Sequence, residues 1–269
     1  MIKKLFTLFK LSRKLAKSDA LNIASKFNKP PTIIKILFNI LSFSFFNTKR
    51  VNFNTNEGEK LSKSLQQMGT TFIKLGQFLA TRPDIIGEEL STQLESLQDR
   101  LPPFSLAEAK KIIKKDLGEE VFNSIINLSE PVAAASIAQV HKAQIDDNGT
   151  IKDVAIKILR PNIKKIFNEE IDALMLFAFF IESFVKKTKR LKLIEVVFLL
   201  KEITNLEMDL RFEAAAANEY AENTINDAGF RVPQIYWNFT SENVMTLDWI
   251  EGVSIRETED LQKRNIDTK

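Results

Sequence analysis

The stretch VAIKILRP, residues 154–161, decides the fold of this chain. Its side chains alternate as in a β-strand, so that one face is entirely aliphatic: Val154, Ile156 and Ile158. The opposite face carries Ala155, Lys157 and Leu159. The aliphatic face can pack against a helix, whereas the face with a small alanine and a long cationic side chain can form the floor of a nucleotide site.

A second strand precedes this one. Two strand candidates, 134–145 and 151–159, are joined through Asp147-Asn148-Gly149, which is a hairpin signal. The first opens within the run PVAAASIAQVHKA, residues 131–143, which has small residues and no glycine where a phosphate loop would be glycine-rich: Ala133, Ala134, Ala135 and Ser136. Because each alanine adds a Cβ that restricts positive φ and close approach, we expect a stiffer cover over a bound phosphate.

Helices are predicted on both sides of this hairpin. Apolar periodicity and helix-breaking residues place them at residues 57–81, 88–100, 163–188 and 192–224. Ser105-Leu-Ala-Glu108 has the form of a capping box and opens a further helix that closes near Gly118. Two short strands are predicted near 234–239 and 243–249. The predicted fold class is therefore α+β.

Charge is unevenly distributed along the chain. Residues 1–50 hold eleven lysines and arginines against Asp19 alone, a net charge of +10, whereas the remaining residues carry a net charge of −7. Apolar residues recur among these lysines at helical spacing, so the segment can present one apolar and one cationic side. This pattern favours an anionic membrane surface as a partner and disfavours nucleic acid.

Other interpretations of the basic segment stay open. An organellar transit peptide fits its composition equally well, and so does an amphipathic helix that packs on its own domain. The apolar run 33–46 contains Lys35 and is shorter than the roughly 20 residues of a spanning helix, so it is interpreted as interfacial or docked on the body. The absence of cysteine excludes disulfides and leaves a reducing compartment as the default.

Several ordered motifs give the chain a resemblance to a known family. They are TFIKLGQFLATRPD (71–84), LQDRLPPF (97–104), PVAAASIAQVHKA (131–143), VAIKILRP (154–161), LEMDLRFEAAAANE (206–219) and TLDWIEGV (246–253). On these residues the chain resembles the UbiB family of atypical, protein-kinase-like proteins, which are associated with ubiquinone (coenzyme Q) biosynthesis.

The resemblance implies a protein-kinase-like small lobe, with an antiparallel sheet and an αC-type helix, after a helical amino-terminal extension. We expect a basic membrane-surface segment at 1–50, the extension at 51–130, the small lobe and hinge at 131–256, and the start of a large lobe at 257–269. Most of the large lobe is expected to be missing. The family's His-x-Asp-x-His-Pro-Gly-Asn loop needs two histidines, whereas the chain has only His141 and no Asp-Phe-Gly.

The helix containing FIKLGQFL carries the first candidate site residues. Lys74 and Gln77 lie three positions apart, on one face of a helix, with Gly76 between them. Without the family, such a pair would be interpreted as a solvated face. The resemblance implies that this pair belongs to the Lys-x-Gly-Gln signature of the family. The signature lies on a helix over the nucleotide cleft, where Gly76 permits close backbone approach.

Carboxylates in the predicted helix 192–224 are the partners for the candidate lysines. On an ideal helix Glu207 and Asp209 are about 200° apart, so they cannot both serve one partner. The resemblance implies that Glu213 pairs with Lys157. It also implies that Glu207, of the Glu-x-Asp signature, meets a second lysine, Lys74. The alternative is a set of charges on a solvated helix face.

A nucleotide is the cofactor that the resemblance implies. ATP or ADP would lie against Ala155, Lys157 and Glu213, beneath the alanine-rich loop 133–136. This loop argues against ordinary phosphorylation of proteins and for ATP hydrolysis tied to a lipid or a ubiquinone precursor. No metal site is expected, because Mg²⁺ would need Asp and Asn from the missing lobe. His141 is interpreted as a strand residue.

Two classes of function follow. One is a kinase-like ATP- or ADP-binding protein that supports ubiquinone biosynthesis at the bacterial inner membrane or a mitochondrial membrane. It would become active only with a large lobe from a second chain. The other is a non-catalytic, membrane-associated regulator or truncated remnant without turnover. We expect the chain alone to be inactive.

Overall fold

The computed structural model describes residues 65–66, 68–95, 101–147, 149–184, 186–253, 255 and 258–264. They divide into two compact units whose segments alternate along the sequence. The first unit takes the described residues up to Glu108, together with Ala133–Gln139 and Leu159–Asp209. The second takes Ala109–Val132, Val140–Ile158 and the described residues from Leu210 onward. The predicted membrane-surface segment 1–50 lies outside the described residues.

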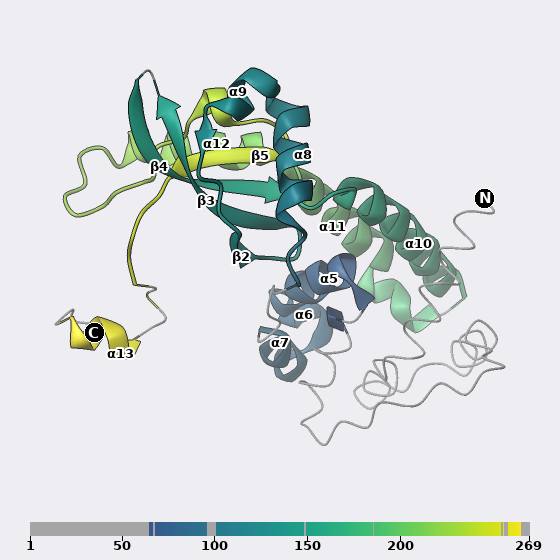
Figure 1. The fold of residues 1–269 in the computed structure, drawn as a ribbon. Helices are drawn as coiled ribbons and strands as arrows, with labels where there is room; N and C mark the ends of the chain where they lie inside the picture. Colours follow the sequence, from purple (N-terminus) through teal and green to yellow (C-terminus); the bar gives the residue numbers. More distant parts are fainter. Residues whose placement is uncertain are drawn as a thin grey trace. The chain divides into compact units, whose positions relative to one another are not determined.

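Helices make up most of the first unit (Figure 1). They are α5 (Thr70–Ala80), α6 (Pro83–Ile86), α7 (Glu88–Glu95), α10 (Ile163–Phe184), the 3-10 helix η1 (Lys186–Leu191) and α11 (Leu193–Glu207). α10 and α11 pack against each other, and α5 packs against both of them and against α7. The helix that carries the Lys-x-Gly-Gln signature is therefore held by several neighbouring helices.

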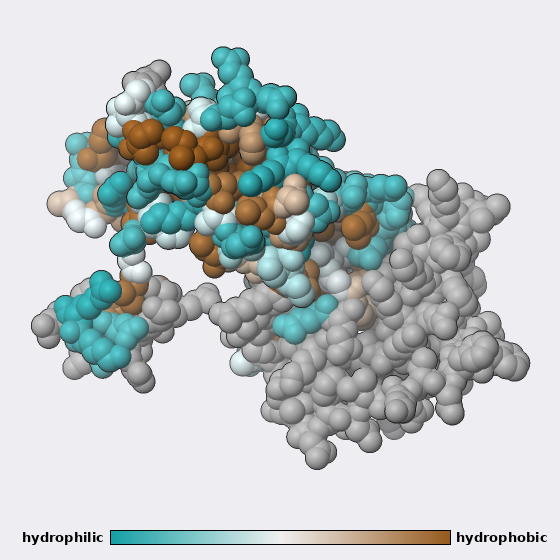
Figure 2. Space-filling view, viewed as in Figure 1, coloured by the Kyte–Doolittle hydropathy of each residue, from teal (hydrophilic) through white to brown (hydrophobic). Residues whose placement is uncertain are grey.

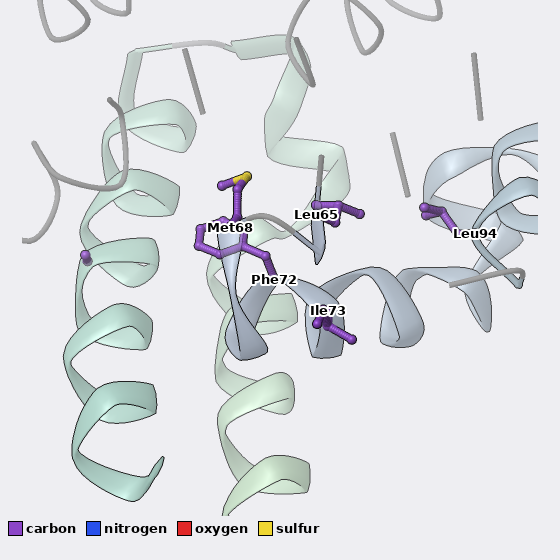
Figure 3. Close-up of a cluster of buried hydrophobic side chains, with 6 residues drawn as sticks. Leu65, Met68, Phe72, Ile73 and Leu94 are labelled. Carbon is purple, nitrogen blue, oxygen red and sulfur yellow. The ribbon is translucent and has the colours of Figure 1, made fainter. Parts of the chain in front are cut away.

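A cluster of buried apolar side chains forms the core of this unit: Leu65, Met68, Phe72, Ile73, Leu94 and Ala173. Figure 3 shows Met68 and Phe72 next to each other at the start of α5. Phe72 is only 2% exposed and Ile73 is fully buried. Because burying one such side chain contributes about 1.5–3 kcal/mol, this cluster fixes the position of α5.

Gly69 interrupts the helix predicted at 57–81. Its φ of 108° and ψ of −176° are rarely adopted by residues with a side chain, so α5 begins only at Thr70. The prediction of one continuous helix is therefore wrong in its described part. Apolar periodicity continues across Gly69, so a prediction from periodicity alone does not detect a glycine that takes a positive φ.

The second unit contains most of an antiparallel sheet (Figure 1). Its strands are β1 (Ile125–Ile126), β2 (Pro131–Ala134), β3 (Ala138–Asp147), β4 (Thr150–Leu159) and β5 (Val244–Asp248), in the order β1-β3-β4-β5 with β2 beside β3. Two helices, α8 (Leu106–Leu117) and α9 (Glu119–Asn123), precede β1. α12 (Leu210–Asn223) and η2 (Trp237–Phe239) come before β5, and α13 (Thr258–Lys263) follows it. The predicted α+β fold class is confirmed.

The alternation predicted for VAIKILRP is present in β4. Val154, Ile156 and Ile158 are completely buried, whereas Ala155 and Lys157 are half-buried. The alternation ends at Leu159, which was predicted on the face of Lys157 but is only 1% exposed. α12 packs against β5, the strand beside β4. The Ser105 half of the predicted capping box is present, since the Glu108 N–H donates to Ser105 Oγ at 3.3 Å.

Four further predicted elements differ from the structure. The strand predicted at 134–145 is β2 and β3, separated by a bend at 135–137. The described part of helix 163–188 consists of α10, which ends at Phe184, and η1, which begins at Lys186, and helix 192–224 is divided into α11 and α12. The strand predicted at 234–239 is an isolated bridge between Ile235 and Leu247, followed by η2.

His141 is a buried residue of β3, as interpreted from the sequence. Its Nδ1–H donates to the carbonyl of Ser129 at 2.8 Å, and no part of the residue is exposed. Burial lowers the pKa of His141 from its ordinary 6.5, although the Ser129 carbonyl and nearby Glu130 oppose this change. The folded chain therefore holds the imidazole neutral.

We expect this histidine to make stability depend on pH. Its folded pKa lies below its unfolded pKa, so its contribution is complete above about pH 6.5 and is lost as the pH falls below that value. Between about pH 7.5 and about pH 5 the free energy of unfolding in urea should fall more steeply for the wild type than for His141→Gln. Parallel pH profiles of the two proteins would contradict this.

Candidate functional site

The lysine of β4 and a glutamate of α12 form an ion pair in the second unit. Lys157 Nζ lies 2.7 Å from both carboxylate oxygens of Glu213, which confirms the predicted contact. The side chains are 25% and 48% exposed, so the pair itself adds little stability. Glu213 stands in the first turn of α12, where the helix dipole favours a carboxylate. The pair therefore serves to hold the ammonium group in one place.

The register of β4 and β5 places apolar side chains beside this lysine. Lys157 is opposite Met245, and Ala155 is opposite Leu247. Opposite residues of an antiparallel pair project to the same side, and so do residues two apart in one strand. These four side chains therefore share one face of the sheet. This face therefore presents a small, apolar surface next to the ammonium group of Lys157, which Glu213 holds in place.

The second predicted ion pair lies within the first unit. Lys74 Nζ of α5 is 2.6 Å from Oε2 of Glu207, the last residue of α11, which confirms this contact too. The Lys74 side chain is only 14% exposed and Glu207 Oε2 is buried, so each charge would be left uncompensated without the other. Gln77 follows one turn along α5 and is half-buried, and Gly76 between them is buried.

The Glu-x-Asp signature is not helical throughout, so the expectation that one helix carries all the predicted carboxylates is wrong. α11 ends at Glu207, and the N–H of Leu210 donates to the carbonyl of Glu242 at 3.0 Å. Met208 and Leu210 are buried at this break, and the N–H of Asp209 donates to the carbonyl of Leu206 at 3.2 Å. Glu207 therefore belongs to the first unit and Glu213 to the second.

The alanine-rich loop belongs to the first unit. Ala133 and Ala134 end β2, whereas Ala135 and Ser136 form the bend before β3. Ala133 is exposed, Ala134 and Ala135 are half-buried, and Ser136 is completely buried. Among the described residues other than glycine, positive φ occurs at Asn127, Asn162 and Lys192. The alanines of the loop therefore adopt backbone conformations that suit a residue with a Cβ.

Hydrogen bonds hold this loop to distant parts of the same unit. The Thr70 hydroxyl at the start of α5 donates to the carbonyl of Ser136 at 3.2 Å. The Gln139 side chain accepts from the Phe104 N–H at 2.9 Å and donates to the Phe104 carbonyl at 3.1 Å. Arg160 donates to the carbonyl of Ala135. Arg160 and Gln139 were absent from the predicted site, although both belong to motifs that carried the resemblance.

The segment after β5 is fixed by a second set of contacts that the sequence did not predict. The Tyr236 hydroxyl donates to Asp248 Oδ1 at 2.8 Å, and Arg231 lies 3.1 Å from Oδ2. Burial, followed by this carboxylate, raises the pKa of Tyr236 to about 12, so the hydroxyl stays a donor throughout the neutral range. Lys142 Nζ lies 4.8 Å from the ring centre of Trp249. The hinge-like stretch is therefore anchored at its start.

The described residues offer neither a membrane span nor a metal-binding cluster. Within the part of the chain that the structure describes, no helix combines the length and the hydrophobicity needed to cross a bilayer. The described ranges also contain no group of three or more His, Asp or Glu side chains able to hold a metal ion. Figure 2 shows apolar side chains at the surface of the sheet-bearing unit, surrounded by hydrophilic ones.

An antiparallel sheet whose strand lysine is paired with a helix glutamate defines a protein-kinase-like small lobe. A model of the ABC1 atypical kinase-like domain matches residues 96–269, and the chain belongs to this family. It is similar to the probable protein kinase UbiB of Marinobacter nauticus, with 33% identity over 240 residues. It is also similar to the proteins of that name from Cellvibrio japonicus, 33% identical over 231 residues, and Azotobacter vinelandii, 36% identical over 211 residues.

These relatives are much longer than the chain. The matches cover 89%, 86% and 78% of this chain but only 43%, 41% and 39% of the three relatives, in the order given. The predicted resemblance to the UbiB family is confirmed, and the chain spans about two-fifths of the length of the proteins that show it.

Proposed function

We propose that this chain is the ATP- or ADP-binding part of a kinase-like protein that supports ubiquinone (coenzyme Q) biosynthesis at a membrane. The observation that carries the proposal is the contact of Lys157 with both carboxylate oxygens of Glu213, each at 2.7 Å. Protein kinases need this type of pair to direct the strand lysine toward the nucleotide phosphates. The names of the curated relatives, which call them probable protein kinases, support the same class.

The residues around this pair fit a nucleotide in size and charge. Ala155 is small and half-buried, and its opposite neighbour Leu247 is apolar, so a planar base has an apolar surface to lie on. Lys157 is two residues further along β4, which corresponds to about 6.6 Å. A base over Ala155 would therefore direct its phosphates toward the ammonium group. The Mg²⁺ that accompanies ATP would be held by Asp and Asn residues of a kinase large lobe.

The proposed chemistry is ATP hydrolysis tied to a lipid or a ubiquinone precursor, and not phosphorylation of proteins. The alanine-rich loop supports it, because Ala135 and Ser136 are held by hydrogen bonds and take no glycine-like conformation. The proposed partners are an anionic membrane surface, reached by the basic residues 1–50, and a second chain that carries a large lobe. The proposed location is the bacterial inner membrane or a mitochondrial membrane, facing a reducing compartment.

Calorimetric titration of the full chain with ADP and ATP tests the nucleotide site. We expect saturable binding of both, and weaker binding of AMP, because it carries fewer phosphates for Lys157. The chain would be judged folded by circular dichroism in the same buffer. Saturable binding without ATP hydrolysis is the result expected for the chain alone, whereas a folded chain that binds neither nucleotide would refute the proposal.

A further inference from the structure

Asp116 joins the last turn of α8 to the bend 241–243, which lies directly before β5. Its Oδ2 accepts from the hydroxyl of Ser241 at 3.1 Å and from the side-chain amide of Asn243 at 2.7 Å. The last turn of a helix disfavours a carboxylate, so these two donors compensate for an unfavourable position. A single oxygen of α8 therefore holds the 241–243 bend at both of its ends.

The 241–243 bend is also closed by hydrogen bonds of its own. The N–H of Ser241 donates to the carbonyl of Val244 at 2.6 Å, and the N–H of Val244 donates to Ser241 Oγ at 3.2 Å. The Ser241 hydroxyl thus accepts from Val244 while it donates to Asp116. Because these bonds fix the shape of the bend, its two contacts with Asp116 also fix the direction of the carbonyl between them, that of Glu242.

The carbonyl of Glu242 caps the start of α12. It accepts from the N–H of Leu210, the first residue of α12, at 3.0 Å. The first N–H groups of a helix have no partner within the helix, so an outside acceptor helps to determine where the first turn lies. Leu210 is completely buried, and Glu213 follows three positions later on the same face of the helix. A shift of the bend would therefore move the carboxylate that contacts Lys157.

We propose that Asp116 is a positioning residue for the nucleotide site, acting through the 241–243 bend and α12 on the Lys157–Glu213 pair. This rests on the proposed function, in which Lys157 contacts the phosphates. An ammonium group that is no longer fixed by its carboxylate binds phosphates more weakly, because it loses more conformational freedom on binding. All the contacts in this chain of effects lie within the second unit, and Asp116 itself does not contact the nucleotide.

Hydrogen–deuterium exchange of the full chain without nucleotide tests the anchoring. In Asp116→Ala we expect peptides that cover the start of α12 to exchange at least about tenfold faster than in the wild type. In Asp116→Asn we expect exchange close to that of the wild type, because both donors meet Oδ2 and the amide oxygen of asparagine can replace it. Asp227→Ala, a matched change at an exposed position, should leave the start of α12 unaffected. Unchanged exchange in Asp116→Ala, or equally fast exchange in Asp116→Asn, would overturn the proposal.

Ligand titrations separate positioning from a general structural role. In Asp116→Ala we expect the Kd for ADP to rise about fivefold, whereas the Kd for adenosine, which has no phosphates, should stay unchanged. In a Glu213→Gln background, Asp116→Ala should cause no further rise, because the carboxylate through which it acts has been removed. Equal changes for ADP and adenosine, or the same rise in both backgrounds, would overturn the positioning role.

Asn243→Ala takes the place of Asp116→Ala if circular dichroism shows that the latter is unfolded. It removes only the 2.7 Å bond, so we expect smaller changes in the same direction in both measurements. No change in either measurement would overturn the proposal. A wild type that binds no ADP refutes the proposed function, and the exchange experiment then still decides whether Asp116 anchors α12.

Discussion

Lys157→Met is expected to weaken ADP binding about tenfold to a hundredfold. A charge-assisted hydrogen bond contributes about 1.5–3 kcal/mol, and each 1.4 kcal/mol changes the Kd tenfold. Methionine keeps much of the length of the side chain but removes the ammonium group. It also leaves the carboxylate of Glu213, now without its partner at 2.7 Å, to repel the phosphates.

A matched lysine on the same strand provides the control. Lys152 is exposed in β4, so Lys152→Met makes the same change of charge and should leave the Kd for ADP within a factor of two or so of the wild type. The double variant Lys157→Met/Glu213→Gln tests whether the pair acts as a unit. We expect it to bind ADP no more weakly than Lys157→Met alone. Similar losses in the two lysine variants would contradict a specific role for Lys157.

Phe72→Ala is expected to destabilise the first unit by about 3–5 kcal/mol. Phe72 is 2% exposed in the cluster that holds α5, so the substitution removes buried apolar surface and leaves a cavity. Local stability can be measured from hydrogen–deuterium exchange of the α5 and α10 peptides. Because α5 also carries Lys74, loss of this packing should loosen the Lys74–Glu207 pair.

Phe198→Ala is the control for this prediction. Phe198 lies on α11 of the same unit but is 53% exposed, so the same substitution should change stability by less than about 1 kcal/mol. A comparable loss in the two variants would show that burial in this cluster does not determine the stability of the unit. It would also mean that α5 is held by other contacts.

Local patterns predicted more of the strands than of the helix ends. Alternation in residues 154–158 correctly identified the buried face of β4 and the face that carries Lys157. The breaks at Gly69 and Asp209 were missed, since apolar periodicity continues across both positions. A helix end depends on what captures its N–H and carbonyl groups, and at Leu210 that partner is Glu242, far along the chain.

The predicted site shows the same division between features that local motifs predict and contacts that depend on distant residues. The two ion pairs were predicted because the motifs of a known family name their members, and both pairs are present at 2.6–2.7 Å. The contacts of the alanine-rich loop were not predicted. Arg160 meets Ala135 across 25 positions and Leu101 across 59, and hydropathy and charge patterns carry no signal for a bond from a guanidinium group to a distant carbonyl.

The amino-acid sequence by itself determined the α+β class, the two-sided character of β4 and the family that supplies the lysine–glutamate pairs. Those properties follow from strand periodicity and from short motifs, which are local. Only the tertiary structure decided that Glu207 and Glu213 belong to different helices, and that Arg160 and Thr70 hold the alanine-rich loop. The physical reason is that a backbone carbonyl accepts from whichever donor the folded chain brings near it, and the whole fold determines which donor that is.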